Sequence, residues 1–211
     1  MKIIINKLLK ANFQYFIIIF IILLLPTFFL NKEFLNLKLN FLHSPFLDFF
    51  FKNVTHFGDG LIYLPIIILT FFFSKKNTVC ILVLFIIQTS ISMLFKEVLM
   101  RYNERPALYL KNTFHLLHKV DGVTIHNYST FPSGHTTTAF AIAFFIFFNF
   151  SISNKLKYFL FILATFVALS RVYLLQHFYI DVLFGYFFGY FAAFLTPLAI
   201  ENNKQLKKFY V

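Results

Sequence analysis

The sequence predicts an all-α protein, a single domain over residues 1–211 that is built as a bundle of six transmembrane helices. Two observations predict this class. Of the 211 residues, 59% are hydrophobic and 13% are charged, and the mean hydropathy is +0.76, which is typical of an integral membrane protein. The apolar residues also form long runs, and short polar segments that carry lysines separate these runs.

Turn residues and basic residues give each expected span its bounds. Lysines precede the first apolar run, as in a signal peptide, but the bulky residues 26–29 follow where a cleavage site needs small ones. We therefore expect a retained first helix. The turn Gly58-Asp59-Gly60 precedes the second run. The six expected spans are residues 13–30, 61–73, 78–100, 136–150, 158–174 and 177–200.

Two polar connections are longer than ordinary turns. Residues 31–52 alternate apolar and polar side chains and are expected to lie along the membrane interface. Residues 102–131 form the longest connection, a length that favours a functional role. Leu110, Phe114 and Leu117 predict a short amphipathic surface helix within it. We expect the histidines of these regions to be surface residues rather than ligands: His43, His56, His115, His118 and His126.

The distribution of positive charge predicts the topology. Six spans place both termini on one side of the membrane, together with ten lysines against the single acid Glu201, whereas the opposite side holds seven acids. The positive-inside rule therefore puts the termini in the cytoplasm. Because the lysines lie at the ends of apolar runs, the net charge of +11 indicates topology and no nucleic-acid partner. The ten lysines are Lys2, Lys7, Lys10, Lys75, Lys76, Lys155, Lys157, Lys204, Lys207 and Lys208.

Ionisable residues stand out in the stretch SRVYLLQHFYID, residues 170–181, because charged groups at membrane depth are costly. His177 and Asp181 are four residues apart, so on a helix the carboxylate can orient the imidazole. On a helix Arg171 would point about 240° away from His177, so both reach one site only if a turn, expected at residues 174–176, separates them. The arginine fork suits phosphate. This stretch alone equally fits a buried ion pair between Arg171 and Asp181.

FPSGHTTT, residues 131–138, opens the fourth expected span. Ser133 is an expected N-cap, and Gly134 lets a ligand approach the exposed N–H groups of a helix start. His135 in this first turn could exchange a proton with a bound group. An ordinary helix start explains the Pro-Ser-Gly sequence equally well.

Two further cations flank the end of the third expected span. Lys96 lies near that end, and Arg105 precedes Pro106, which disfavours helix at Arg105. Arg105 is therefore expected to fold back from a loop. The alternative for each residue is a cation at the level of the lipid headgroups.

In the six-span topology these polar residues converge at the outer ends of spans three to six, which favours a site over an ion pair. No metal-ligand cluster with zinc spacing appears, and the single cysteine, Cys80, excludes an intrachain disulfide. We expect no metal and no cofactor. The candidate site residues are Lys96, Arg105, Ser133, Gly134, His135, Arg171, His177 and Asp181.

The ordered set Lys…Arg-Pro, Pro-Ser-Gly-His and Ser-Arg-x5-His-x3-Asp resembles the motifs of the type 2 phosphatidic acid phosphatase superfamily. The resemblance covers about residues 50–200, and the six-helix layout agrees with it. In the first motif, eight residues separate Lys96 from Arg105, two more than the family usually has. An insertion near Tyr102-Asn103 would restore the spacing, or Arg101 would take part of the role.

The resemblance implies metal-independent hydrolysis of a lipid phosphate through a phosphohistidine. His177 would be the nucleophile, Asp181 would orient it, and His135 would exchange the proton. The substrates implied are phosphatidylglycerophosphate, undecaprenyl diphosphate, phosphatidic acid or lipid A 1-phosphate, at an outward-facing site of the bacterial cytoplasmic membrane. The alternatives are a lipid-to-lipid phosphotransferase and a non-enzymatic six-span protein. The residues implied to hold the phosphate are Lys96, Arg105, Ser133, Gly134 and Arg171.

Overall fold

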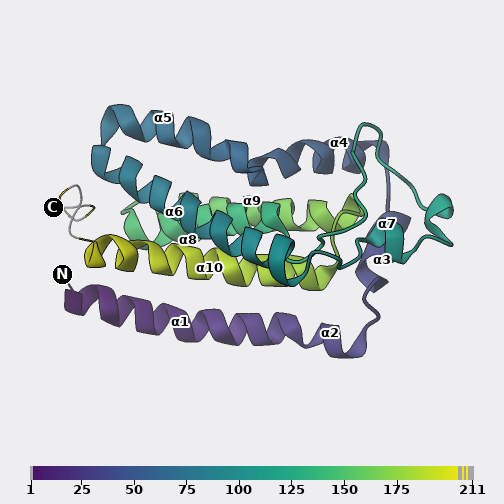
Figure 1. The fold of residues 1–211 in the computed structure, drawn as a ribbon, viewed down its shortest axis with the longest axis horizontal. Coiled ribbons are helices and arrows are strands. Elements are labelled where there is room, and N and C mark those ends of the chain that lie inside the picture. The colour runs from purple at the N-terminus through teal and green to yellow at the C-terminus, as the bar shows by residue number, and fades with distance from the viewer. Residues whose placement is uncertain (1, 204–205, 207, 209–211) are drawn as a thin grey trace.

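The computed structural model describes residues 2–203, 206 and 208, with side chains from residue 13 onward, and within these residues it contains helices and no strand. The long helices run along one axis (Figure 1). The α-helices are α1 (Lys2–Leu24), α2 (Pro26–Phe29), α3 (Phe34–Phe41), α4 (Pro45–Val54), α5 (Tyr63–Phe73), α6 (Lys75–Met93), α7 (Pro106–Tyr109), α8 (Gly134–Asn149), α9 (Asn154–Tyr173) and α10 (Tyr179–Asn202). Short 3-10 helices are η1 (Thr55–Gly58), η2 (Gly60–Ile62) and η4 (Phe114–Leu116), and η3 (Leu94–Leu99) is a π-helix that continues α6.

Three helical segments are long and apolar enough to cross a membrane, namely Lys75–Leu99, Asn154–Tyr173 and Tyr179–Asn202. Two bent pairs raise the number to five if each pair is one span: α1 and α2 with α3, bent by 90°, and α4 and η1 with η2 and α5, bent by 58°. Helix α8 is apolar but has 16 residues, which cover about 24 Å of a hydrocarbon core that is about 30 Å thick. The all-helical class is confirmed for the described residues, with three to five candidate spans.

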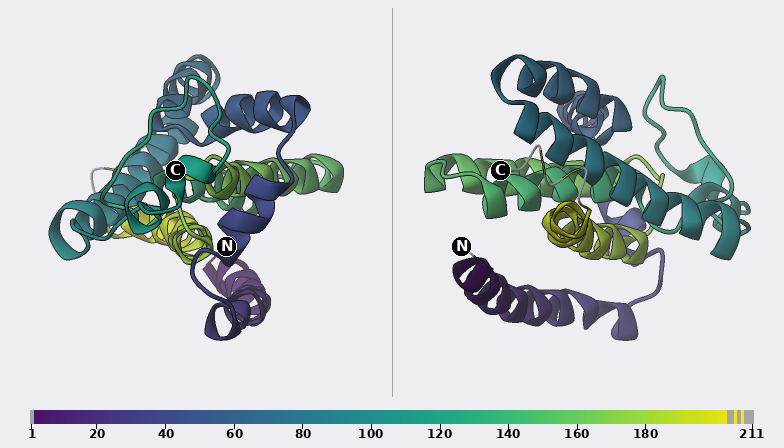
Figure 2. Two further views of the ribbon diagram at one scale, coloured as in Figure 1. Left: turned by 90° about the vertical axis from the view of Figure 1, so that its right-hand side faces the viewer. Right: turned by 60° about the vertical axis from the view of Figure 1, so that its left-hand side comes forward.

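The two ends of the bundle differ. Helix α1 begins and α10 ends at the same end, where the turn between α5 and α6 also lies (Figure 1). At the opposite end, which we call the loop end, the chain passes from α9 to α10 and the long connection that contains α7 lies across the bundle (Figure 2). Two of the ten lysines used for topology, Lys204 and Lys207, lie outside the described residues.

The long connection departs from the expected structure. The amphipathic helix predicted around Leu110, Phe114 and Leu117 is wrong, because α7 ends at Tyr109 and only the 3-10 turn η4 follows. His118 is only partly solvated, with 30% of its side chain exposed: its Nε2 lies 2.8 Å from Asp48 Oδ2, and its ring stacks on His43 at 4.0 Å. These contacts hold the connection against α3 and α4, which occupy the segment expected along the interface.

Helices α8 and α10 pack closely because α10 presents glycine to α8. A Cβ atom added at Gly189 would lie 2.8 Å from the Ala141 nitrogen, and one added at Gly185 would lie 2.9 Å from the Ser133 oxygen. Small residues spaced four apart allow this close approach between membrane helices. Helix α1 packs against another side of α10, where the centres of the stacked Phe16 and Tyr190 rings lie 3.7 Å apart. The glycine contact fixes the start of α8 against the start of α10, at the loop end.

We expect Gly189→Val to lower the free energy of unfolding by about 1–3 kcal/mol, because the added methyl groups have no space between α8 and α10. The midpoint of thermal unfolding in detergent, followed by circular dichroism, measures this effect. Gly60→Val is the matched control, since no atom lies within 4 Å of a Cβ added there. Equal loss of stability in both variants would contradict the packing argument.

Candidate active site

The chain reverses between α9 and α10 in a short turn at the expected place. Helix α9 ends at Tyr173, α10 begins at Tyr179, and Leu175 between them has a φ of 56°. The backbone N–H of His177 donates to the carbonyl of Arg171 at 3.0 Å. The turn therefore brings Arg171 and His177 together, although a continuous helix would point them apart.

His177 and Asp181 face each other, but Thr130 intervenes. His177 Nδ1 lies 3.8 Å from Asp181 Oδ2, and both side chains are 2% exposed. The Thr130 hydroxyl donates to the same Oδ2 at 2.5 Å and lies 3.4 Å from Nδ1. The backbone N–H of Phe178 also donates to Oδ2 at 2.8 Å. Asp181 thus caps α10 and at the same time presents one oxygen to both Thr130 and His177.

The backbone at His177 is held from a distant part of the chain. Asn36 in α3 is fully buried, and its Nδ2 donates to the carbonyls of His177 at 3.0 Å and Val172 at 3.1 Å. Asn36 thereby satisfies the His177 carbonyl and adds a second donor to the Val172 carbonyl, which also accepts from the Leu175 N–H. Asn36 is therefore part of the framework of the site, which sequence reasoning did not identify.

Arg105, rather than Arg101, folds back into the loop end. Its Nε donates to the Tyr128 carbonyl at 2.7 Å, and its Nη1 donates to the Gln176 carbonyl at 3.1 Å. Gln176 in turn donates from Nε2 to the Thr124 carbonyl at 3.0 Å. Arg105 is buried, whereas Arg101 is exposed. Because Pro106 starts α7, Arg105 has an extended backbone at its N-cap, as the sequence predicted.

Arg171 is buried beneath the turn with spare hydrogen-bonding capacity. Its Nη1 donates to the Thr55 hydroxyl at 2.8 Å, while its Nε is buried without a hydrogen-bond partner. No carboxylate lies within ion-pair distance of Arg171 among the described residues, so the buried Arg171–Asp181 ion pair considered from the sequence is not formed. A buried guanidinium with an unpaired donor is suited to an anion.

The start of α8 supplies the third group of site residues. Ser133 is the N-cap, and its Oγ accepts from the Thr136 N–H at 3.4 Å and from the Thr136 hydroxyl at 2.9 Å. A Cβ added at Gly134 would lie 3.5 Å from Lys96 Nζ, so the absence of a side chain leaves room beside the ammonium group. His135 follows in the first turn and is half-buried.

The electrostatics of the loop end favour an anion. Burial first, and then the positive charges of Arg105, Lys96 and Arg171, lower the pKa of His177 well below its usual value. The same three charges, after burial, lower the pKa of His126 on the long connection. Burial also lowers the pKa of Arg105, and the charge of Asp181 partly opposes this effect. The imidazole of His177 is therefore neutral at pH 7, next to a cluster of cations.

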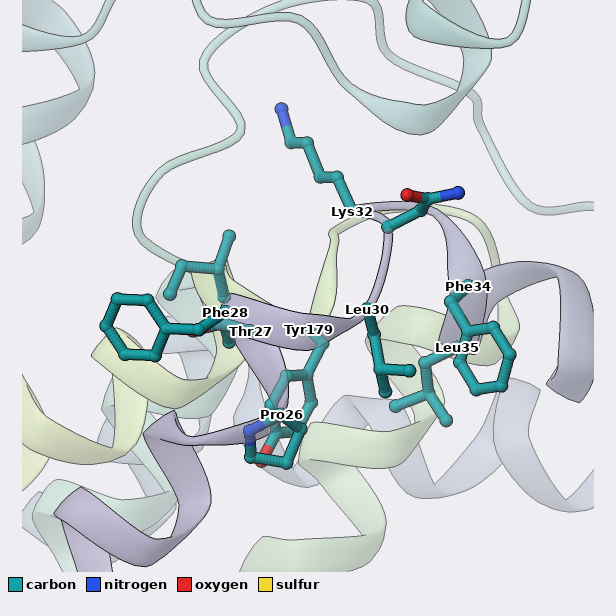
Figure 3. A pocket seen from close by; sticks show the side chains of 10 residues that line it. Pro26, Thr27, Phe28, Leu30, Lys32, Phe34, Leu35 and Tyr179 are labelled. Atoms are coloured by element: carbon teal, nitrogen blue, oxygen red, sulfur yellow. The ribbon is translucent and has the colours of Figure 1, made fainter.

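Two cavities lie near these residues, and they differ in lining. A cavity of about 320 Å³, which we call the polar cavity, lies between α6 and α8 and has Lys96, Gly134 and His135 in its wall. A cavity of about 430 Å³, which we call the apolar pocket, is formed by residues 26–35 with Tyr179 and Ile180 and contains no candidate site residue (Figure 3). In Figure 3 the Lys32 side chain points away from the apolar side chains, and its Nζ lies 4.1 Å from the centre of the Phe178 ring.

Sequence reasoning missed three polar residues that shape the site: Thr130, Asn36 and Gln176. Thr130 directly precedes FPSGH, and Gln176 directly precedes His177, so proximity to the motifs is a signal for both. Asn36 has no such signal. Within the described residues no group of three or more His, Cys, Asp or Glu side chains could hold a metal ion.

Comparison with known proteins gives a consistent result. Residues 77–205, which contain all the candidate site residues, match the PAP2 superfamily. The chain is 30% identical over 179 residues to phosphatidylglycerophosphatase B of Bacillus subtilis (strain 168), covering 79% of this chain and 82% of that protein.

Two solved structures are similar. Aquifex aeolicus LpxE superimposes with a TM-score of 0.66 and 25% identity, covering 78% of this chain and 93% of that chain. The transmembrane PAP2 type phosphatidylglycerolphosphate phosphatase from Bacillus subtilis gives a TM-score of 0.60 and 25% identity, covering 90% and 96%. The similarity therefore extends over most of each protein.

We expect Arg105→Ala to weaken the binding of orthophosphate by about ten-fold or more, because a charged donor to an anion contributes about 1.5–3 kcal/mol. Isothermal titration of the detergent-purified protein with orthophosphate measures the dissociation constant. Arg101→Ala is the matched control and should change it by less than about two-fold, since Arg101 is exposed. A larger effect of Arg101→Ala than of Arg105→Ala would reverse the assignment.

Proposed function

This chain belongs to the PAP2 superfamily and is a phosphatase, and from that premise we propose that it hydrolyses a lipid phosphate, without a metal ion, through a phosphohistidine at His177. The observation that carries the proposal is the neutral, buried imidazole of His177, which has Asp181 on one side and three cations around it. A neutral histidine can attack phosphorus, and a cluster of cations stabilises the charge of the phosphoryl group.

His177 is the nucleophile. Its Nδ1 faces Asp181, so Nε2 is the ring nitrogen that attacks phosphorus. A bond forms between Nε2 and phosphorus while the bond from phosphorus to the leaving oxygen breaks. The imidazole then carries a positive charge, and the carboxylate of Asp181 stabilises it through Nδ1–H.

Five residues hold the phosphate. Lys96, Arg105 and Arg171 supply positive charge, and the unpaired Nε of Arg171 supplies a free donor. The Ser133 hydroxyl and the Gly134 N–H add neutral donors at the start of α8, where the helix dipole also favours an anion. Phosphoryl transfer needs positioning and charge stabilisation above all, and these side chains meet both needs.

His135 exchanges the proton. It protonates the departing alkoxide or phosphate, which leaves as an alcohol from a monoester and as a lipid monophosphate from a diphosphate. It then removes a proton from the water that attacks the phosphohistidine, releasing inorganic phosphate and neutral His177. One general acid–base group typically contributes about 10²–10⁴ in rate.

The substrate is a lipid phosphate monoester or diphosphate that is reached from the membrane. The curated relative is a phosphatidylglycerophosphatase, which supports phosphatidylglycerophosphate, with undecaprenyl diphosphate, phosphatidic acid and lipid A 1-phosphate as the other candidates. In our proposal both bent pairs and the short helix α8 cross the membrane, which gives six spans. The lysine distribution then puts the termini in the cytoplasm and the loop end outside the bacterial cytoplasmic membrane.

We expect His177→Ala and His135→Ala each to abolish phosphate release from these lipids, measured with detergent-purified protein in the presence of EDTA. The wild-type protein should retain full activity with EDTA, since only protein cations bind the phosphate. His115→Ala, an exposed histidine of the long connection, is the matched control and should leave the rate unchanged. Normal turnover by His177→Ala, or loss of wild-type activity with EDTA, would refute the mechanism.

Thr130 positions Asp181 for this reaction. Its hydroxyl donates to the oxygen of Asp181 that faces His177, so it fixes the carboxylate while His177 changes charge. Thr130→Val removes this donor with little change in volume, and we expect kcat to fall about ten-fold, since a hydrogen bond to a charged group contributes about 1.5–3 kcal/mol. KM should change little, because Thr130 does not bind the phosphate.

Thr130→Ser keeps the hydroxyl and should restore most of kcat. Steady-state rates of phosphate release for both variants test this role, with thermal unfolding to compare their stability. If Thr130→Ser is as slow as Thr130→Val, the methyl group rather than the hydroxyl matters, and Thr130 only fills space.

A further inference from the structure

We propose that the polar cavity between α6 and α8 receives the leaving alcohol of the substrate, and that this alcohol carries free hydroxyl groups, as a glycerol or sugar headgroup does. A diacylglycerol or a polyprenyl chain bonded directly to the phosphate does not meet this requirement. The inference rests on the proposed function, because it uses His177 as the nucleophile and His135 as the proton donor.

The reaction geometry points to this cavity. In an in-line displacement the nucleophile and the leaving oxygen lie on opposite sides of phosphorus. His177 occupies one side, so the leaving oxygen lies on the side of His135, which protonates it. His135, Gly134 and Lys96 form one wall of the polar cavity. The group attached to the leaving oxygen therefore extends into this cavity.

Polar side chains line much of the cavity, and Met93 and Glu97 also lie in its wall. Gln88 and Ser92 on α6 and Lys96 on η3, which continues α6, are spaced four apart, and all three line the cavity as one stripe. Thr138 lies one turn after His135 on α8 and lines the cavity from the other side. Uncharged polar residues in this position recognise hydroxyl groups, whereas hydrocarbon placed against them would leave buried donors and acceptors unpaired.

Hydrogen bonds within the protein use only part of the donors and acceptors of this stripe. The Thr138 hydroxyl donates to Gln88 Oε1 at 3.4 Å, and Gln88 Nε2 donates to the Thr89 hydroxyl at 2.9 Å. The first of these bonds joins α8 to α6, as polar side chains do between membrane helices, whereas the second lies within α6. Ser92, however, is 9% exposed and its Oγ is buried without a hydrogen-bond partner. A buried hydroxyl without a partner is destabilising by about 1–3 kcal/mol, and a hydroxyl of the leaving alcohol would satisfy it.

The contrast between the two cavities supports the same assignment. The polar cavity has a volume of about 320 Å³, at the lower end of the range of roughly 300–1,000 Å³ for small-molecule sites. The apolar pocket is larger, but its lining contains neither His135 nor any other candidate site residue (Figure 3). Of these two cavities, the polar cavity is therefore the one that lies beside His135 and can receive the leaving group.

The experiment measures kcat/KM for phosphate release, with EDTA present, from phosphatidylglycerophosphate, lipid A 1-phosphate, phosphatidic acid and undecaprenyl diphosphate. We expect the wild-type protein to prefer one of the first two, and which one it prefers distinguishes a glycerol from a sugar. Ser92→Ala should lower kcat/KM on that substrate about three- to ten-fold, the effect of one lost hydrogen bond, and should change the rate with phosphatidic acid by less than about two-fold.

Two further variants complete the test. Ser90 lies on the exposed side of the same helix, so Ser90→Ala should leave the rates with all four lipids unchanged. Gln88→Met is a second change in the cavity and should reduce the same preference. A preference of the wild-type protein for phosphatidic acid or undecaprenyl diphosphate would overturn the inference and leave the proposed function standing. An equal fall of kcat/KM on all four lipids in Ser92→Ala would have the same consequence. Release of phosphate from none of them would overturn both.

Discussion

The structure depends on the close contact between the N-terminal halves of α8 and α10. Gly185 and Gly189 let the two helices approach, and the Ser133 N–H donates to the Asp181 carbonyl at 3.0 Å across this contact. The start of α8, proposed to bind phosphate, and Asp181 on α10, proposed to serve the nucleophile, are therefore joined by a main-chain hydrogen bond. A site built on two packed helices keeps its geometry better than one built on loops alone, and here the helices also lie within a membrane protein whose lipid-facing surface supplies no polar partners.

Charge is the second constraint. Three basic side chains meet at the loop end, and the carboxylate of Asp181 is hydrogen-bonded to Thr130 and to the start of α10. The hydrogen-bond donors of these basic side chains are partly satisfied by backbone carbonyls, as for Arg105, and partly left unpaired, as for Arg171. Mutual repulsion raises the free energy of the empty site. Binding of a phosphate relieves this repulsion, so the arrangement favours an anion in the ground state and still more in a transition state that spreads charge over the phosphoryl oxygens.

The two cavities differ in their relation to the candidate site. The polar cavity continues from His135 along the Gln88, Ser92 and Lys96 stripe, while the lining of the apolar pocket contains no candidate site residue. Hydrophobic burial gives a lipid its affinity with little direction. Selection among lipids must therefore come from hydroxyl and amide groups, whose hydrogen bonds have direction and whose desolvation is costly when they are left unpaired.

The helical class and most of the candidate site can be predicted from the amino-acid sequence, because long apolar runs can satisfy their backbone in lipid only as helices and because ionisable residues are costly there. The turn after α9 can be predicted as well, since Arg171 and His177 would otherwise point apart. Four features depend on the folded structure: the choice of Arg105 over Arg101, the position of Thr130 between His177 and Asp181, the burial of Asn36 and the contact of His118 with Asp48. Each of these depends on a polar partner far away in the chain; Asn36 and His177 are 141 residues apart. Hydrogen bonds between distant segments follow no local period, so a pattern along the chain carries no trace of them.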